Sequence, residues 1–136
     1  MVRNGKMTLN FSISELTHSE TANKFRINNT PNMQALDNLL NLIFYVLQPL
    51  RDKLGKPIIV TSGFRCQKLN QAVGGVPNSQ HLTGQAVDIV VNGMTIDQLI
   101  QFIRLSDIRY DQLIHEGQWV HISYNHGKNR MQYIKM

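Results

Sequence analysis

A long apolar stripe between Met33 and Leu54 constrains what this chain can fold into. Apolar residues recur there in steps of three and four, which is typical of one face of an α-helix. Pro31 suits the first turn of that helix, Gly55 ends it, and Pro49 is expected to kink it because proline removes a backbone donor. We expect this helix to be the largest element of the core. The stripe consists of Met33, Leu36, Leu39, Leu40, Ile43, Phe44, Leu47, Leu50 and Leu54.

Short β-branched and alternating segments predict the strands that this helix would cover. Residues 58–61 form a brief β-branched run, which indicates a buried strand. Residues 85–91 alternate, so a strand there would place Asp88 on one face and Val87 and Ile89 on the other. Further strands are expected at 111–116, 119–124 and 131–135, and helices at 65–73 and 95–105. The sum is an α+β fold with helices packed on a small, mainly antiparallel sheet.

Two capping-box patterns lie before the long helix. Ser12-x-x-Glu15 and Thr17-x-x-Glu20 each place a hydroxyl three residues ahead of a carboxylate. They predict one or two short helices between residues 12 and 25.

The length and charge of the chain narrow its class. At 136 residues it has the size of one domain, so residues 1–136 are expected to form a single unit, with 1–10 as a loosely ordered extension. Fourteen Lys and Arg against nine Asp and Glu give a net charge of +5, which favours a polyanionic partner. The basic residues are scattered without aromatic interleaving, so no nucleic-acid partner is expected. No apolar run has the length of a membrane span, so no membrane insertion is expected.

Two histidines and an aspartate carry the chemistry. His81, Asp88 and His121, called the ligand triad below, supply the two imidazoles and the carboxylate of a catalytic zinc site that leaves one position open for water. We expect His81 in the loop before a strand, Asp88 on that strand and His121 on another. A carboxylate inside an apolar strand is costly unless it pairs or binds a metal. The triad therefore predicts one Zn²⁺ ion and metal-assisted hydrolysis.

A predicted hairpin brings a general base beside the triad. If residues 117–118 form a two-residue loop, Glu116 pairs with Trp119, and Glu116, Trp119 and His121 point to the same face. A diagonal separation of roughly 7 Å would let Glu116 accept a proton without binding the metal. His115 would point to the other face.

Other chemically capable side chains are weighed against ordinary structural roles. Arg65 follows the predicted strand at 58–61 and suits a substrate carboxylate, although a surface salt bridge would explain it equally well. Cys66 is expected to be a small buried residue and not a nucleophile. His18 and His126 are expected to be structural, with His126 the first to reconsider.

The assembled motifs resemble those of the zinc peptidases of the D-alanyl-D-alanine carboxypeptidase family, the M15 peptidases, and especially their small bacterial and phage members. The family pattern Ser-x-His-x-x-Gly-x-Ala-x-Asp with a downstream His is matched in full. Similar blocks extend over roughly residues 10–125, including Val60–Arg65 and Trp119–Ser123. The matching residues are Ser79, His81, Gly84, Ala86, Asp88 and His121.

The resemblance implies the site roles and the substrate class. One Zn²⁺ would be held by the ligand triad, water would be the nucleophile, and the fold would be of the hedgehog and DD-peptidase type. Arg65 would stabilise charge on the scissile carbonyl, with Ser79 and Trp119 completing the substrate-binding set. The substrates would be peptidoglycan stem peptides, cut either at the terminal D-Ala-D-Ala bond or at an internal bond.

The chain departs from the family pattern at the base. Several members place the acid three residues before the last histidine, where this chain has Gln118. Others in the wider fold family carry it further upstream, which keeps Glu116 as the candidate. The alternative is a catalytically silent, zinc-containing module that binds cell wall, in which Gln118 marks a lost base.

Two other enzyme classes fit the residues less well. A non-haem iron oxygenase also uses two histidines and a carboxylate, but the His-x-Asp pair typical of that class is absent. A thiol hydrolase built on Cys66 would survive chelation and be killed by alkylation, the reverse of what we expect.

The cellular setting is an expectation of the same kind. The first ten residues include Arg3 and Lys6 but no apolar run of signal-peptide length. We expect synthesis in the cytoplasm, followed by action on the wall after release as a phage or prophage lysin or by a non-classical route. A monomer is expected.

Overall fold

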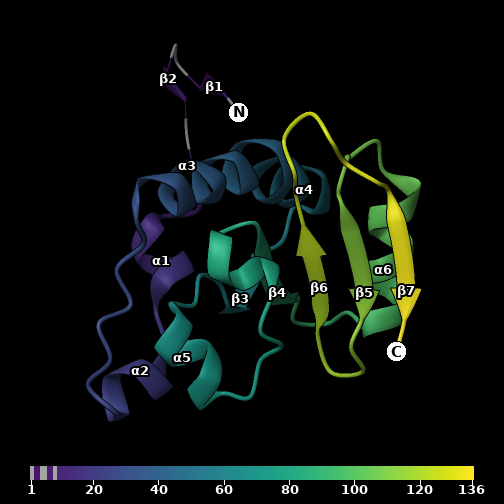
Figure 1. Cartoon of the computed structure of the whole chain (residues 1–136). Coiled ribbons are helices and arrows are strands. Elements are labelled where there is room, and N and C mark those ends of the chain that lie inside the picture. Colours follow the sequence, from purple (N-terminus) through teal and green to yellow (C-terminus); the bar gives the residue numbers. More distant parts are fainter. Residues whose placement is uncertain (1, 4–5, 8) are drawn as a thin grey trace.

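Five strands form the main sheet in the described part of the chain, which in this computed structural model comprises residues 2–3, 6–7 and 9–136 (Figure 1). The strand order is β3-β4-β6-β5-β7; β5 and β7 run parallel and the other neighbours antiparallel. This confirms the α+β fold with a mainly antiparallel sheet. The strands are β3 Ile59–Ser62, β4 Ala86–Val90, β5 Gln112–His115, β6 Val120–Ser123 and β7 Gln132–Lys135.

The N-terminal residues stand apart from this sheet. β1 Val2–Arg3 and β2 Lys6–Met7 pair with each other as an antiparallel ribbon. The loosely ordered extension expected over 1–10 includes residues 1, 4–5 and 8, which lie outside the described residues. That expectation stays a prediction.

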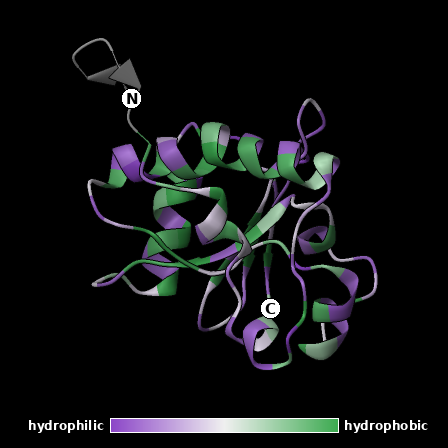
Figure 2. Cartoon of the chain, turned by 90° about the vertical axis from the view of Figure 1, so that its left-hand side faces the viewer, coloured by the Kyte–Doolittle hydropathy of each residue, from purple (hydrophilic) through white to green (hydrophobic). Residues whose placement is uncertain are grey.

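The predicted long helix is present and lies along one end of the sheet. It runs without interruption through α3 Met33–Leu42, the π-helical turn η1 Ile43–Leu47 and α4 Gln48–Leu54. Figure 2 shows apolar and polar stretches alternating along it. Its buried face joins β4, β5, β6 and α6 in one core, as expected, although Met33, Leu40 and Phe44 of the predicted stripe are exposed. The fully buried members from the helix include Leu39, Leu42, Leu47 and Leu50.

The long helix widens into a π-helical turn just before Pro49. Pro49 has no N–H to donate to the preceding turn, and its ring crowds the carbonyl four residues earlier. The π-helical turn ends immediately before α4 begins, so the backbone absorbs the missing bond there. Gly55 then ends the helix in the left-handed conformation at φ 66°.

Other helices pack on the edge strand β3 and on the inner strands β5 and β6. α1 Ile13–Thr17 contacts β3, and α6 Ile96–Leu105 packs on β5 and β6, starting with a Thr95–Gln98 capping box (Figure 1). The remaining ones are α2 Glu20–Lys24, α5 Gln67–Ala72 and the 3₁₀ turn η2 Gln80–Thr83. No helix in the described residues is long and apolar enough to cross a membrane.

Ser19, not Thr17, caps α2. The Ser19 hydroxyl accepts from Ala22 N at 3.1 Å, whereas Thr17 ends α1 and its hydroxyl donates back to Ile13 O at 2.9 Å. The short helices predicted between residues 12 and 25 are thus confirmed as α1 and α2, but the Thr17 pattern does not supply the cap, because α1 ends at Thr17 and uses its hydroxyl. Ser12 caps α1 as predicted, accepting from Glu15 N at 3.2 Å.

The strand at 58–61 was predicted to be buried, and this is wrong for β3. β3 is an edge strand that pairs with β4 alone, and Ile59 is 40% exposed. A register irregularity between Val60 and Ser62 accompanies the pairing. A short β-branched run reads the same in both settings, because periodicity does not reveal whether a strand has one neighbour or two.

Candidate metal centre

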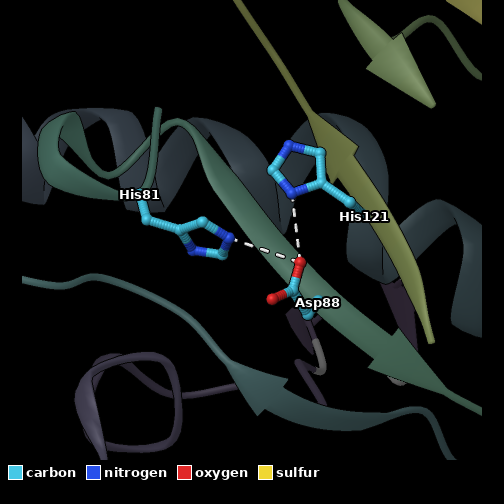
Figure 3. Close-up of side chains that lie close together, drawn as sticks. All are labelled: His81, Asp88 and His121. Atoms are coloured by element: carbon cyan, nitrogen blue, oxygen red, sulfur yellow. Dashed lines mark hydrogen bonds and ion pairs between the residues drawn. The ribbon is translucent and has the colours of Figure 1, made fainter. Parts of the chain in front are cut away.

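The structure brings the ligand triad together from three separate elements. His81 lies in η2, Asp88 in the middle of β4 and His121 in β6, where Asp88 and His121 are direct cross-strand partners. Figure 3 shows both imidazoles turned toward the Asp88 carboxylate. One ligand atom from each residue lies within 4.8 Å of the others. The set can hold one metal ion.

Strand alternation places Asp88 on the site face. Val87 and Ile89 are fully buried in the core on the opposite face of β4, as the sequence pattern predicts. Asp88 is still only 7% exposed, because η2 and β6 cover it. Its position follows from core packing on the other side of the strand.

The turn that carries His81 is held between α3 and β4. The Ser79 hydroxyl accepts from His81 N at 3.1 Å and so caps η2. Gly84 ends η2 at φ 74°, and a Cβ there would overlap the carbonyl of Ala35 in α3. The contact with α3 therefore requires a glycine for two reasons, backbone conformation and space.

The His81 ring has a defined orientation. Its Nδ1 lies 2.7 Å from the Gly63 carbonyl, which can only accept, so Nδ1 carries a proton. Nε2 is buried and makes no hydrogen bond to any described residue, although Asp88 Oδ1 lies 3.3 Å away. A lone pair on Nε2 facing a carboxylate oxygen is repulsive until a cation lies between them. This orphaned atom fits a metal ligand, with Gly63 as the outer-shell partner that sets the tautomer.

Asp88 is ionised at neutral pH. Burial by itself would raise its pKa, but the hydrogen bond with His121 at 3.1 Å and the close contact with the His81 imidazole outweigh it, and the pKa falls to about 2. A carboxylate must be deprotonated to bind a metal, so this electrostatic setting suits the role.

The triad opens into a hollow of about 630 Å³. A second hollow, of about 640 Å³, adjoins it and extends toward α2, where His18 and Glu20 line it. The two share Arg65, Val73, Asp88 and Trp119. The two hollows therefore adjoin at Asp88, a member of the triad.

The predicted hairpin is confirmed in its register. His121 pairs with Ile114, and Glu116 N donates to Trp119 O at 3.1 Å, which leaves residues 117–118 as the two-residue loop. Glu116, Trp119 and His121 all line the hollow of the triad. The structure thus places Glu116 beside the triad, and its service as a base stays a prediction.

Arg65 lies where the two hollows meet. Its Nε is buried without a hydrogen-bond partner among the described residues. Burial lowers its pKa, and the charge of Asp88 partly offsets this. Its backbone N donates to His81 O at 3.0 Å, which ties the arginine to the metal-ligand turn.

The segment before Arg65 is fixed by an asparagine whose role sequence reasoning missed. Asn29 Nδ2 donates to Thr17 O and Phe64 O at 3.0 and 2.9 Å, and Asn29 Oδ1 accepts from Cys66 N at 2.7 Å. One side chain thereby joins the end of α1 to both neighbours of Arg65. The residue precedes the long helix in sequence, and no local pattern there points to this contact.

The remaining predicted side chains have other surroundings. His115 points away from the hollow, with Nε2 3.1 Å from Asp97 Oδ1 in α6. His126 packs against Tyr45 with the two rings tilted, and its Nδ1 lies 3.1 Å from the Tyr124 hydroxyl. Cys66 is partly buried at the start of α5. The Ser79 hydroxyl serves the cap of η2, so its contact with substrate stays a prediction.

Sequence reasoning also missed an ionic cluster beside the hollow, centred on the buried Asp111. Asp111 binds Arg130 and Gln80, which are separated from it by 19 and 31 residues. Nothing in the sequence marks such distant residues as partners.

Comparisons with known proteins agree with the geometry. Residues 9–123 match the sequence model of the family described as peptidase M15. A stretch of 59 residues is 41% identical to the zinc D-Ala-D-Ala carboxypeptidase of Streptomyces albus G, covering 43% of this chain and 23% of that protein. The alignment therefore spans less than a quarter of the relative's length. Because the family model matches most of its length, the chain belongs to the peptidase M15 family.

Proposed function

We propose that the chain is a zinc-dependent metallopeptidase that hydrolyses peptide bonds in peptidoglycan stem peptides. The observation that carries this is the ligand triad, in which the buried Nε2 of His81 faces Asp88 Oδ1 without a hydrogen bond, in a hollow that Glu116 also lines. Membership of the peptidase M15 family and the similarity to a zinc D-Ala-D-Ala carboxypeptidase support it.

The triad has the donors that zinc prefers. His81 would bind through Nε2, Asp88 through a carboxylate oxygen and His121 through Nδ1, the atoms that converge in the structure. When bound, Zn²⁺ polarises a carbonyl and lowers the pKa of a water toward ~7. The Gly63 carbonyl keeps His81 in the tautomer that leaves Nε2 available.

Glu116 is the group on this face that can move a proton. It lies beside the triad at the end of β5 without belonging to it, so its carboxylate can take a proton from the attacking water and return it to the leaving amine. The two-residue turn that follows fixes its backbone.

Arg65 and Trp119 would hold the peptide. The half-buried guanidinium of Arg65 lines both hollows, so it would stabilise the charge that develops on the scissile carbonyl. Trp119 is 37% exposed and lines both hollows, which offers an apolar wall to a peptide lying across them.

The bond cleaved and the biological setting are parts of the proposal. The two hollows that meet at Arg65 suit the substrate of either a D,D-carboxypeptidase or an endopeptidase, since both enzymes need room for residues before the scissile bond. Delivery to the wall as a phage or prophage lysin, with the chain acting as a monomer, would put the enzyme in contact with this substrate.

Digestion of purified peptidoglycan tests the proposal directly. Mass spectrometry should find newly released peptides or D-alanine with the zinc-loaded protein, none after chelation, and recovery when zinc is returned. The masses identify the cleaved bond. Binding to peptidoglycan without any product would instead favour the silent wall-binding module, and products that persist after chelation would contradict the zinc mechanism.

A further inference from the structure

Asp111 is the centre of a buried ionic cluster on the rim of the triad's hollow. It lies directly before β5 and is 1% exposed. Its carboxylate accepts from the backbone N, Nε and Nη2 of Arg130 at 3.0, 2.8 and 2.9 Å, and from Gln80 Nε2 at 2.9 Å. The hydrogen bonds from Arg130 hold the pKa of Asp111 at about 2, so this carboxylate stays charged. Both partners are therefore held in one geometry.

The cluster presents part of the Arg130 guanidinium to the hollow. Arg130 lines the hollow of the triad, and its side chain is 54% exposed. Arginine carries five N–H donors in a planar fork, and Asp111 engages those on Nε and Nη2. The Nη1 group has no hydrogen-bond partner among the described residues. The N–H groups of Nη1 are therefore held in a fixed orientation and are suited to binding a carboxylate.

Gln80 holds Asp111 from the other side. Its Nε2 donates to Asp111 Oδ2 at 2.9 Å, while its Oε1 is buried without a partner among the described residues and is shielded from the hollow. Gln80 directly precedes His81, so the turn that carries a residue of the ligand triad also fixes the carboxylate that holds Arg130.

Arg130 and Arg65 have different places relative to the two hollows. Arg65 lines both hollows, whereas Arg130 lines only the one bounded by η2 and β5. The hollow of the triad therefore has a second cation in its lining, besides Arg65. Two separate guanidiniums are more than one scissile carbonyl requires.

We propose that Arg130, positioned by Asp111, binds a carboxylate of the peptide substrate. Arg130 is thereby a specificity-determining residue for acidic peptides. This rests on the proposed peptidase function, because it assigns a substrate group to that site. The carboxylate is either the C-terminus of the peptide or an acidic side chain within it.

Three peptides separate these sources. The probe is the acetylated pentapeptide L-Ala-D-Glu-L-Lys-D-Ala-D-Ala, compared with its C-terminal amide and with a version that carries glutamine in place of glutamate. The zinc-loaded wild type, Arg130→Gln, Arg130→Lys and Lys128→Gln are assayed for kcat and KM on each. Lys128→Gln is the matched control, because it removes an exposed charge from the same loop.

The wild type should prefer the peptide that keeps the bound carboxylate. Arg130→Gln should raise KM for that peptide about tenfold and remove the preference, because a charge-assisted bidentate contact is lost. Arg130→Lys should give an intermediate result, since it keeps the charge and a contact with Asp111 but not the planar fork. Lys128→Gln should behave as the wild type. The bound carboxylate is the one missing from the peptide whose KM is the same for the wild type and for Arg130→Gln.

A second readout separates this inference from the proposed function. Calorimetric titration of the same peptides into the metal-free proteins should show the same preference, lost in Arg130→Gln. If the wild type hydrolyses nothing but this preference is found, the peptidase proposal fails and the carboxylate site stands. If Arg130→Gln lowers the melting temperature while the ranking of the three peptides stays unchanged in both assays, Arg130 is only a structural partner of Asp111 and the inference is overturned.

Discussion

The two sides of the triad's hollow are built in different ways. In the ligand triad His81 and Asp88 are buried and His121 is half-buried, and all three lie on elements whose opposite faces pack in the core or against α3. The β5–β6 turn with Glu116 and Trp119 lies at the end of a hairpin and is partly exposed. Metal binding is thus tied to the stability of the whole domain, whereas substrate contacts depend on local surface groups. Mutations on the two sides should separate these properties.

The largest effect should come from Asp88→Asn. The amide keeps the shape of the carboxylate but removes the charge that a metal ligand needs, so activity should fall on the order of 10³-fold or more. The zinc-induced rise in melting temperature should vanish with it, because ligand binding no longer favours the folded state. Zinc titration by calorimetry and thermal melts with and without zinc check this.

The control is Asp107→Asn, which removes an exposed carboxylate paired with Lys53. It should retain activity and the zinc response. Unchanged zinc affinity in Asp88→Asn would show that the triad is not the metal site.

Glu116→Gln should separate catalysis from metal binding. Because Glu116 is on the substrate side of the hollow, kcat should fall about 10²- to 10⁴-fold while the zinc response of the melting temperature stays as in the wild type. Steady-state kinetics on the acetylated pentapeptide, alongside zinc melts, measure both. Full activity in this variant would remove Glu116 as the base and direct attention to other groups of the hollow.

Gly84→Ala should lower stability and weaken the metal site together. A methyl group there meets the Ala35 carbonyl in a left-handed turn, so unfolding should become easier by about 3 kcal/mol. Gly127→Ala is the matched control, since it has a similar φ but open space around its Cβ, and it should cost about 1 kcal/mol. Urea unfolding measures both. Equal losses would show that the contact with α3 does not hold η2 in place.

A smaller effect should appear on acidification. Asp111 has a pKa of about 2 in the folded chain against an ordinary value of 3.8, so its contribution of about 2 kcal/mol is present above pH 4 and is lost as pH falls through 2. The difference in unfolding free energy between the wild type and Asp111→Asn should therefore shrink over that range. Urea unfolding at pH 5, 3 and 2 follows it, and a constant difference would contradict the assigned pairing.

Local patterns predicted the elements well where one interaction decides them. The alternation around Asp88 and the step of three and four in the long helix each reflect burial of one face, which any tertiary setting would require. The hairpin register followed from turn length alone, and it is confirmed by the pairing of His121 with Ile114.

The wrong predictions concern segments whose local pattern fits two different structural settings. Thr17 has a capping pattern, yet α1 uses its hydroxyl and Ser19 caps α2. β3 has the composition of a buried strand but pairs with one neighbour only. Where a helix ends and how many neighbours a strand has depend on the surrounding elements, and the local sequence does not specify them.

The sequence by itself determined the chemistry of the metal centre, because His81, Asp88 and His121 are metal ligands by residue type and a carboxylate within an apolar strand is costly unless it pairs or binds a metal. Only the tertiary structure decided the tautomer of His81, through the Gly63 carbonyl, and the placing of Arg130 by Asp111. These contacts join segments far apart in the chain. Their geometry arises from packing, because hydrogen bonds demand distances that spacing along a chain cannot set.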